Sequence, residues 1–293
     1  MLLTGPVPQF TTLVDAFRQG LKELGYVEGQ NIAFEYRYAE SQPERLRLLV
    51  SELVAVPVDV MVIGNTRALQ AALQTTSAVP IVAPLLSDPE GDGCVFGSIA
   101  HPDKNCTGLS TQAPGLSAKR VDFLKDAFPA ITRLAIIWNP ANPSSSEVFA
   151  ETENAARRRG LQVLSLNVQR AQDFTFASAA DERFDAVITL EDVIITVNSN
   201  AVFDFVAQRR VPAIYPSELF SRARGLMSYG PPFTGQYKRA ATYVDRLLKG
   251  EKPANLPVSQ PTEFVLIVNL KAANTLGLTI SADLLSRADE VIQ

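Results

Sequence analysis

Polar side chains follow several of the predicted strands, at the points where helices begin. Asn65 and Thr66 come after a short β-branched run, and Ser87 and Asp88 follow a second apolar run. Hydroxyl and amide groups at such junctions cap helices, and they can also hold a polar ligand. Thr66 could bind an anionic group through its hydroxyl and backbone N–H, and Asp88 could bind an ammonium group. These junctions therefore favour non-covalent binding of a small charged molecule.

The same pattern recurs in the second half of the chain. Its junctions carry one amide, several hydroxyls, a carboxylate and one aromatic ring, at Asn139, Ser144, Ser145, Asp192, Ser217 and Tyr229. Each residue taken alone is equally explained by helix capping, turn formation or core packing. Ligands of open parallel sheets bind beyond the carboxyl ends of the strands. We therefore expect a binding site only if these junctions converge on one cleft.

Motifs for catalysis are missing from the sequence. It contains no GxSxG, GxxxxGK[ST], HExxH or GxGxxG pattern. With His101 as its single histidine, neither a catalytic triad nor a transition-metal site is easily built. Cys94 and Cys106 match no zinc or redox spacing, and they are either a disulfide or two small buried residues. We predict no enzymatic activity, no cofactor and no metal.

The composition indicates a soluble globular protein of two domains. The chain has 293 residues, which suits two cores, and 46% of them are hydrophobic, which argues against disorder. A net charge of −4 argues against nucleic acid as a partner, because phosphate binding needs clustered cations. No apolar run approaches the ~18–20 residues that span a bilayer. The N-terminus lacks a signal peptide and begins as if inside a strand, so we expect an export leader upstream.

Strands and helices alternate along the whole chain, as in parallel βαβ sheets. A helix predicted over about 234–248 lies between two proline-marked connections, which suits a chain that crosses between lobes and returns. The fold class predicted is α/β, with two Rossmann-like lobes of parallel sheet joined by a three-strand hinge. The predicted lobes are 1–113 with 231–255 and 114–230 with 256–293. Other predicted elements include a strand at 32–38 and a helix at 173–183.

Several segments resemble those of one known family. They are AFRQGLKELGYVEGQN at 16–31, VPIV at 79–82 with SDP at 87–89, NPANP at 139–143, GLMSYGP at 225–231, LKGEKPANLPV at 248–258 and LKAA at 270–273. In this order and spacing they are similar to ABC transporter substrate-binding proteins, in the branch with tryptophan- and phenylalanine-binding members and the type I periplasmic-binding-protein fold. Asn65-Thr66-Arg67 departs from the usual small-Thr-Pro loop, and the two cysteines replace aliphatic residues.

The resemblance implies an exported, periplasmic or extracytoplasmic receptor that delivers its ligand to ABC permease subunits. The ligand expected is an amino acid or a small aromatic carboxylate, captured by closure of the two lobes. Thr66 would hold its carboxylate and Asp88 its amine, while the second lobe would close with Asn139, Ser144, Ser145 and Asp192. Two alternatives are a ligand-sensing domain of a regulator or receptor with the same fold, and an enzyme on a two-lobe scaffold.

Overall fold

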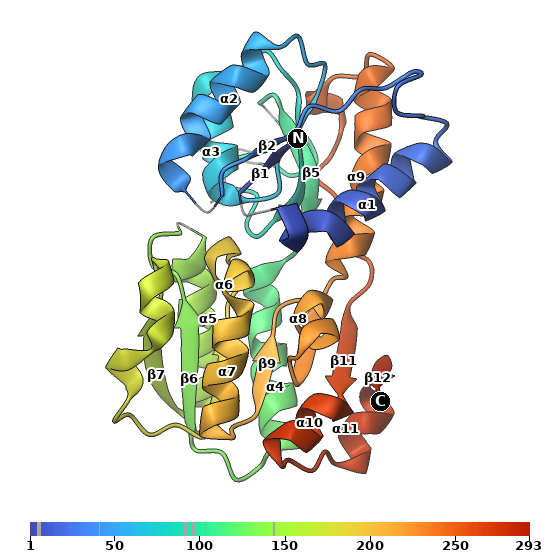
Figure 1. Cartoon of the computed structure of the whole chain (residues 1–293). Coiled ribbons are helices and arrows are strands. Elements are labelled where there is room, and N and C mark those ends of the chain that lie inside the picture. The colour runs from blue at the N-terminus through green and yellow to red at the C-terminus, as the bar shows by residue number, and fades with distance from the viewer. Residues whose placement is uncertain (5–6, 41, 91–92, 95–97, 103, 143) are drawn as a thin grey trace. The chain divides into compact units, whose positions relative to one another are not determined.

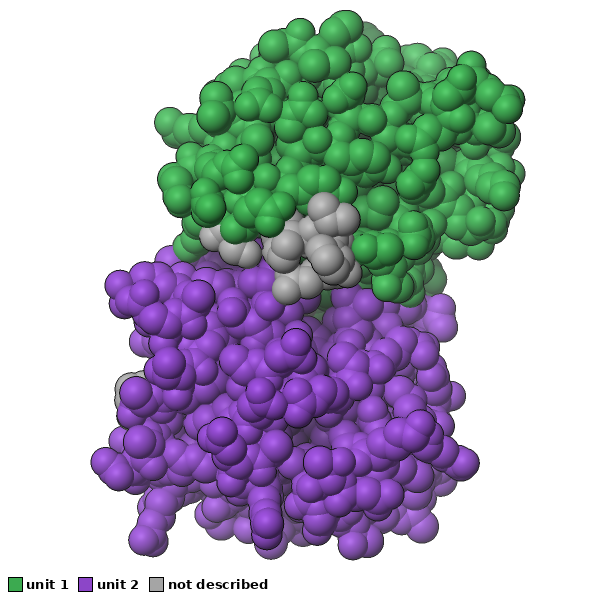
Figure 2. Space-filling view, in the orientation of Figure 1, with its two compact units in different colours: residues 1–112, 233–262 green, residues 113–232, 263–293 purple. Residues whose placement is uncertain are grey.

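The computed structural model describes residues 1–293 except 5–6, 41, 91–92, 95–97, 103 and 143 (Figure 1). The chain forms two compact units, coloured separately in Figure 2. Unit 1 comprises Met1–Gln112 with Phe233–Thr262, and unit 2 comprises Ala113–Pro232 with Glu263–Gln293. The chain therefore passes between the units three times. Both are α/β units, as the alternation of strands and helices predicts.

Unit 1 is built on five short parallel strands. Strand β1 pairs with β2, β3 pairs with β4, and β4 pairs with β5, while a parallel bridge from Leu2 to Ile63 joins the two groups. The strands are β1 (Leu2–Leu3), β2 (Arg37–Tyr38), β3 (Met61–Val62), β4 (Ile81–Leu86) and β5 (Cys106–Ser110). The helices are α1 (Val7–Glu23), α2 (Leu46–Ala55), α3 (Thr66–Thr75) and α9 (Phe233–Leu248), with 3-10 turns at Pro43–Arg45 and Pro253–Asn255.

Helix α9 comes late in the chain but packs against α1, β4 and β5 of unit 1 (Figure 1). Gly20 makes this approach possible, because a Cβ added there would lie 2.5 Å from the carbonyl oxygen of Lys238. Tyr26 donates a hydrogen bond to Asp245 at 2.9 Å, which ties the end of the α1 segment to the same helix. Residues more than 200 positions apart thus share one core.

Unit 2 has a seven-stranded sheet in the order β12-β11-β10-β9-β8-β6-β7. All neighbours are parallel except β10 and β11. The strands are β6 (Arg133–Trp138), β7 (Gln162–Asn167), β8 (Ala186–Thr189), β9 (Ala213–Tyr215), β10 (Met227–Gly230), β11 (Val265–Asn269) and β12 (Glu290–Ile292). The helices are α4 (Ala113–Ala127), α5 (Ser145–Arg158), α6 (Val193–Val197), α7 (Ser199–Arg209), α8 (Glu218–Ala223), α10 (Leu270–Leu276) and α11 (Ala282–Arg287).

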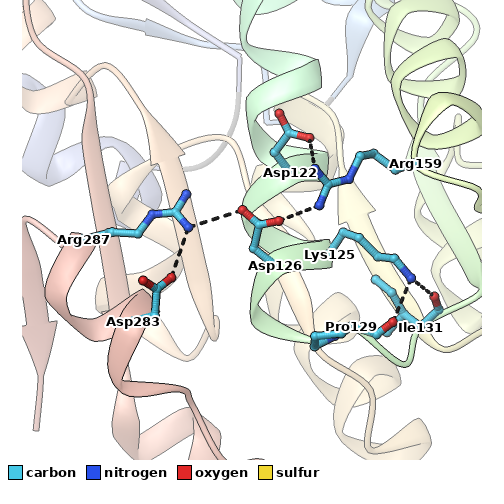
Figure 3. Close-up of polar contacts among 8 residues, drawn as sticks. All are labelled: Asp122, Lys125, Asp126, Pro129, Ile131, Arg159, Asp283 and Arg287. Carbon is cyan, nitrogen blue, oxygen red and sulfur yellow. Dashed lines mark hydrogen bonds and ion pairs between the residues drawn. The ribbon is translucent and has the colours of Figure 1, made fainter.

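The C-terminal half of α4 is tied to its neighbours by ion pairs (Figure 3). Arg159, after α5, contacts Asp122 at 3.2 Å and Asp126 at 2.5 Å. Arg287, at the end of α11, contacts Asp126 at 3.2 Å and Asp283 at 3.4 Å. Both arginines of this cluster contact at least one carboxylate, so their charges are compensated on the surface of unit 2.

The segment predicted as a helix at 173–183 is instead two 3-10 turns, at Ala171–Thr175 and Ala177–Ala179. Phe176 has a left-handed backbone between them, with φ 50°. Phe174 and Phe176 are both buried and contact each other edge to face, and Phe176 stacks on Phe205 at 4.0 Å. Residues two apart face different sides of a helix, so a continuous helix could not bury both rings.

Two further expectations differ from the structure. The predicted strand at 32–38 is reduced to β2, two residues long. The chain returns to unit 2 after Thr262, later than the predicted boundary at 255. Hydrogen bonds explain the later boundary, because Val258 donates to Ile99 O at 2.7 Å and Ser259 N donates to Gly108 O at 3.0 Å, both within unit 1. In the part of the chain that the structure describes, no helix has the length and apolarity needed to cross a bilayer.

Candidate functional site

The carboxyl ends of β1, β3 and β4 lie at one edge of the unit 1 sheet, because these strands are parallel. Asn65 follows β3 and caps α3, since its Oδ1 accepts a hydrogen bond from the backbone of Ala68 at 2.8 Å. Its Nδ2 donates to Thr4 Oγ1 at 2.7 Å, which links the segments after β1 and β3. Thr66 is buried at the first position of α3. The structure thus gives Asn65 a capping role beside Thr66.

Ser87 and Asp88 follow β4 directly, at the same edge of this sheet. Ser87 is buried and Asp88 is half-buried. Asp88 Oδ1 accepts a hydrogen bond from the backbone N–H of Glu90 at 3.2 Å, the pattern of an Asx-turn. All four residues predicted for the first lobe therefore lie at one edge of one sheet.

Cys94 and Cys106 form a disulfide, which settles the alternative left open by the sequence. Both residues are fully buried in the core of unit 1. Cys106 opens β5, whereas Cys94 lies in the segment that follows Asp88. The bond therefore anchors the chain downstream of the Ser87–Asp88 turn to the sheet that carries it.

Tyr237 of α9 reaches the same edge of unit 1, although no pattern in the sequence marks it as a candidate. A Cβ added to Gly64, the residue before Asn65, would lie 2.0 Å from the Tyr237 hydroxyl oxygen. That hydroxyl is buried and has no hydrogen-bond partner among the described residues. Burial raises the pKa of Tyr237 above its ordinary value, so the group is neutral at physiological pH. Gly64 is required here because any side chain would displace the tyrosine.

In unit 2 the predicted residues Asn139 and Asp192 meet through hydrogen bonds. The Nδ2 groups of Asn139 and Asn142 donate to Asp192 Oδ2 at 3.1 and 2.8 Å. Asp192 Oδ1 accepts from the backbone N–H of Ile194 at 2.8 Å and so caps α6. Asp192 therefore joins the loop after β6 to the loop after β8, and much of its acceptor capacity is used inside the protein.

Three predicted serines lie nearby, where helices follow β6 and β9. Ser144 and Ser145 stand at the start of α5, and Ser217 precedes α8. All three are buried, and the hydroxyls of Ser145 and Ser217 have no hydrogen-bond partner among the described residues. Ser144 and Ser217, although in cap positions, make no side-chain capping bond. Capping, the ordinary explanation for a serine before a helix, thus does not account for Ser217.

Tyr229 packs its ring against two other aromatic rings. Its ring lies 4.9 Å from that of Phe123 and 6.2 Å from that of Phe264. Burial is the main reason that the pKa of Tyr229 is raised. Its backbone carbonyl, however, accepts a hydrogen bond from Arg120 Nε at 2.8 Å. The contribution of Tyr229 in this structure comes from its main chain and its packing.

Arg120 is the residue at this edge that the sequence interpretation missed. It lies on α4, its side chain is 1% exposed, and its Nη2 donates to Pro216 O at 3.4 Å. Burial lowers the pKa of Arg120 to about 10, while the charge of Glu191 raises it. The guanidinium therefore remains charged at neutral pH. A Cβ on Gly230 would lie 2.3 Å from Pro216 O, so the strand ends leave room only for glycine beside this contact.

The signal that could have identified Arg120 is its place in a helical stripe. Leu116, Arg120, Phe123 and Leu124 recur at helical spacing, and the other three are buried apolar residues. An arginine in the buried stripe of a helix is rare unless a partner compensates its charge. Such a position marks a functional candidate from sequence alone.

Comparisons with known proteins agree with this architecture. The family model described as "ABC transporter substrate binding protein" matches residues 7–292. The tyrosine-binding protein of Clostridioides difficile is 22% identical over 279 residues, which cover 94% of this chain and 80% of that protein.

Two solved structures are similar over almost their full length. A conserved domain protein from Vibrio cholerae has 25% identity and a TM-score of 0.91, with 99% of this chain and 98% of that one covered. An ABC domain from Streptococcus pneumoniae in complex with L-Trp has 23% identity and a TM-score of 0.87, with 99% of each chain covered. These matches confirm the predicted type I periplasmic-binding fold, and the family is one of binding proteins and not of enzymes. The chain therefore belongs to the ABC transporter substrate-binding protein family and is a solute-binding protein of that class.

Proposed function

We propose that the ligand of this protein is an aromatic amino acid or a closely related small aromatic carboxylate. The observation that carries the proposal is the similarity, over nearly the whole chain, to a tyrosine-binding protein and to a structure holding L-Trp. Both named ligands combine an aromatic ring with a carboxylate and an ammonium group. The protein would deliver this ligand to the permease subunits of an ABC importer.

In this proposal the polar edges of the two units would supply the groups that such a ligand needs. In unit 1, Asp88 would bind the ammonium group, with Ser87 and Thr66 beside it. In unit 2, Asn139, Ser144, Ser145 and Ser217 would contribute amide and hydroxyl groups. Asp192 would act by holding Asn139 in place through their 3.1 Å hydrogen bond. Closure of the two units on the ligand would turn binding into a signal for the permease.

The disulfide supports a location outside the cytoplasm. Disulfides persist in oxidising compartments such as the periplasm and are rare in the reducing cytosol. The bond between Cys94 and Cys106 lies in the core of unit 1 and joins two segments of it. Location outside the cytoplasm also suits a receptor for an importer, and the match to a transporter family gives no support to the alternative of a regulator's sensing domain.

A binding screen with the purified chain tests the proposal. Thermal shift and calorimetry would compare L-tryptophan, L-tyrosine and L-phenylalanine with the other L-amino acids, benzoate and glucose. A dissociation constant near 1 μM corresponds to about −8 kcal/mol. At a hundredfold excess over that constant, the ligand should stabilise the folded protein by about 3 kcal/mol.

The D-enantiomers of the aromatic amino acids serve as the matched control, because they keep the ring and both charges. We expect them to bind at least tenfold more weakly. If the protein binds glucose alone, or binds none of the aromatic acids, the proposed ligand class is wrong. Chemical turnover of any bound compound, detected by mass spectrometry, would contradict the assignment as a binding protein.

A further inference from the structure

A buried cation stands at the carboxyl edge of the unit 2 sheet. Arg120 projects from α4, which packs against β8, β9 and β10. Its Nε and Nη2 donate to the backbone carbonyls of Tyr229 and Pro216, at the ends of β10 and β9. Both partners are neutral. The guanidinium is thus fixed in position by two strand ends without receiving a countercharge from either.

The remaining donor of this side chain has no partner. Arg120 Nη1 is buried and makes no hydrogen bond to any described residue. The hydroxyls of Ser117 and Ser217 are also buried and without a partner. Ser117 lies three residues before Arg120 on the same face of α4, and Ser217 directly follows Pro216. Three buried donors, two on α4 and one next to a residue that Arg120 contacts, are therefore unused by the described residues, which is costly in a protein interior.

The charge of Arg120 is only partly balanced within unit 2. Glu191, after β8, is half-buried and is the acidic residue whose charge acts on the guanidinium by raising its pKa. The structure records no salt bridge between the two side chains among the described residues. Buried charges in proteins are normally paired or serve a function.

We propose that Arg120 binds the carboxylate of the transported ligand through Nη1, with Ser217 as a second donor. This inference rests on the proposed function, and it moves the carboxylate site from Thr66, where the sequence places it, to unit 2. A guanidinium matches a carboxylate in charge and in planar geometry. Since Nη1 is closed off from solvent, binding includes a side-chain rearrangement at this edge.

A purely structural role for Arg120 makes a different prediction. If Arg120 only ties β9 to β10, its loss disturbs the site for every ligand equally. If it contacts the carboxylate, its loss affects only ligands that carry one. The ratio of affinities for an acid and its carboxamide separates the two roles, because the carboxamide keeps the ring and the ammonium group but has no negative charge.

The experiment measures dissociation constants for L-tryptophan, L-tyrosine, L-tryptophanamide and L-tyrosinamide by calorimetry. Wild type should prefer each acid over its amide by about a hundredfold. Arg120→Gln should lower acid affinity by about a hundredfold and amide affinity by less than about threefold. Lys119→Gln is the matched control, since it removes the same charge from the neighbouring exposed position and should change neither constant. Ser217→Ala should lower acid affinity by about tenfold, and it provides the test if Arg120→Gln does not fold.

Equal losses for acid and amide in Arg120→Gln or Ser217→Ala would overturn the inference and leave the proposed ligand class intact. The inference about Arg120 would also be overturned if both variants still preferred the acid over the amide and Thr66→Val did not. A wild-type protein that binds acid and amide equally would also overturn it. Failure of wild type to bind either acid would overturn the proposed ligand class, and the inference with it.

Discussion

The carboxyl edges of the two sheets are stabilised by different means. In unit 1 the segment after β4 is anchored covalently, through Cys94 and Cys106, and Asn65 caps α3. In unit 2 the described loops are held by hydrogen bonds, with Asp192 accepting from three N–H groups and Arg120 donating to two strand ends. The edge without a covalent anchor is the one with a buried cation, whose charge Glu191 balances only in part. Both edges hold buried hydroxyls without a partner among the described residues, but only the unit 2 edge adds a buried cation, Arg120. The difference assigns the covalent anchor to unit 1 and the buried positive charge to unit 2.

The largest expected effect is loss of the covalent anchor. Replacing both cysteines, Cys94→Ser with Cys106→Ser, should destabilise unit 1 by about 3 kcal/mol, the value expected for closing a loop of this length. The midpoint of urea unfolding, monitored by far-UV circular dichroism, should shift to a lower urea concentration. Trp138, the single tryptophan of the sequence, lies in unit 2. The urea unfolding midpoint measured by its fluorescence should therefore stay unchanged.

A reducing agent gives the internal check on this prediction. It should reproduce the shift in wild type and do nothing to the double variant. If the midpoints measured by circular dichroism and by Trp138 fluorescence shifted together, the two units would unfold as one. The disulfide would then stabilise the whole molecule and not unit 1 alone.

The next effect in size concerns the hydrogen bonds of unit 2. Asp192→Ala should destabilise unit 2 by about 2 kcal/mol, because two amides and one backbone N–H lose a charged acceptor. Here the Trp138 fluorescence midpoint should move, the reverse of the disulfide result. Asp204→Asn is the control, since its exposed pair with Arg224 should leave the midpoint unchanged. An unmoved midpoint in Asp192→Ala would show that these bonds contribute nothing.

The smallest effect is expected at the compensated surface cluster of α4 (Figure 3). Burial raises the pKa of Asp126, but hydrogen bonds and charges from Arg159 and Arg287 outweigh it, so the pKa lies below its ordinary value. Asp126→Asn should cost up to about 1 kcal/mol at neutral pH.

The pH dependence gives the sign of this contribution. A lowered pKa in the folded state means that the stabilisation is present above the unfolded pKa, near 4, and is lost as pH falls through the folded value. Wild type should therefore lose its advantage over Asp126→Asn below about pH 4. A difference that persists unchanged in acid would assign the effect to packing and not to charge.

Much of the fold could be predicted from the periodicity of apolar residues, because apolar strand and helix segments alternate with turns in both units. The junction residues Asn65, Ser87 and Asn139 do lie at strand ends, since the βα rhythm fixes where each strand stops. Their partners could not be predicted in the same way. The contact of Asn139 with Asp192 joins loops 53 positions apart, and no local pattern encodes it.

The helix predicted at 173–183 failed for a related reason. Its composition suits a surface helix, but two phenylalanines two positions apart both enter the core and force the backbone to turn. Arg120 was overlooked because charge is usually interpreted as exposure, whereas its spacing relative to Leu116 and Leu124 indicated burial.

The late position of α9 bears on how the molecule is made. Helix α9, which approaches α1 closely at Gly20, begins at Phe233. Residues beyond 233 must therefore be translated before α9 can cover α1. Strands β11 and β12 of the unit 2 sheet likewise follow α9 in the sequence. Both units therefore include contacts between residues far apart in sequence, and such contacts slow folding. A chain synthesised only as far as about residue 230 therefore lacks α9, and the surface of α1 that α9 covers stays exposed until α9 is made.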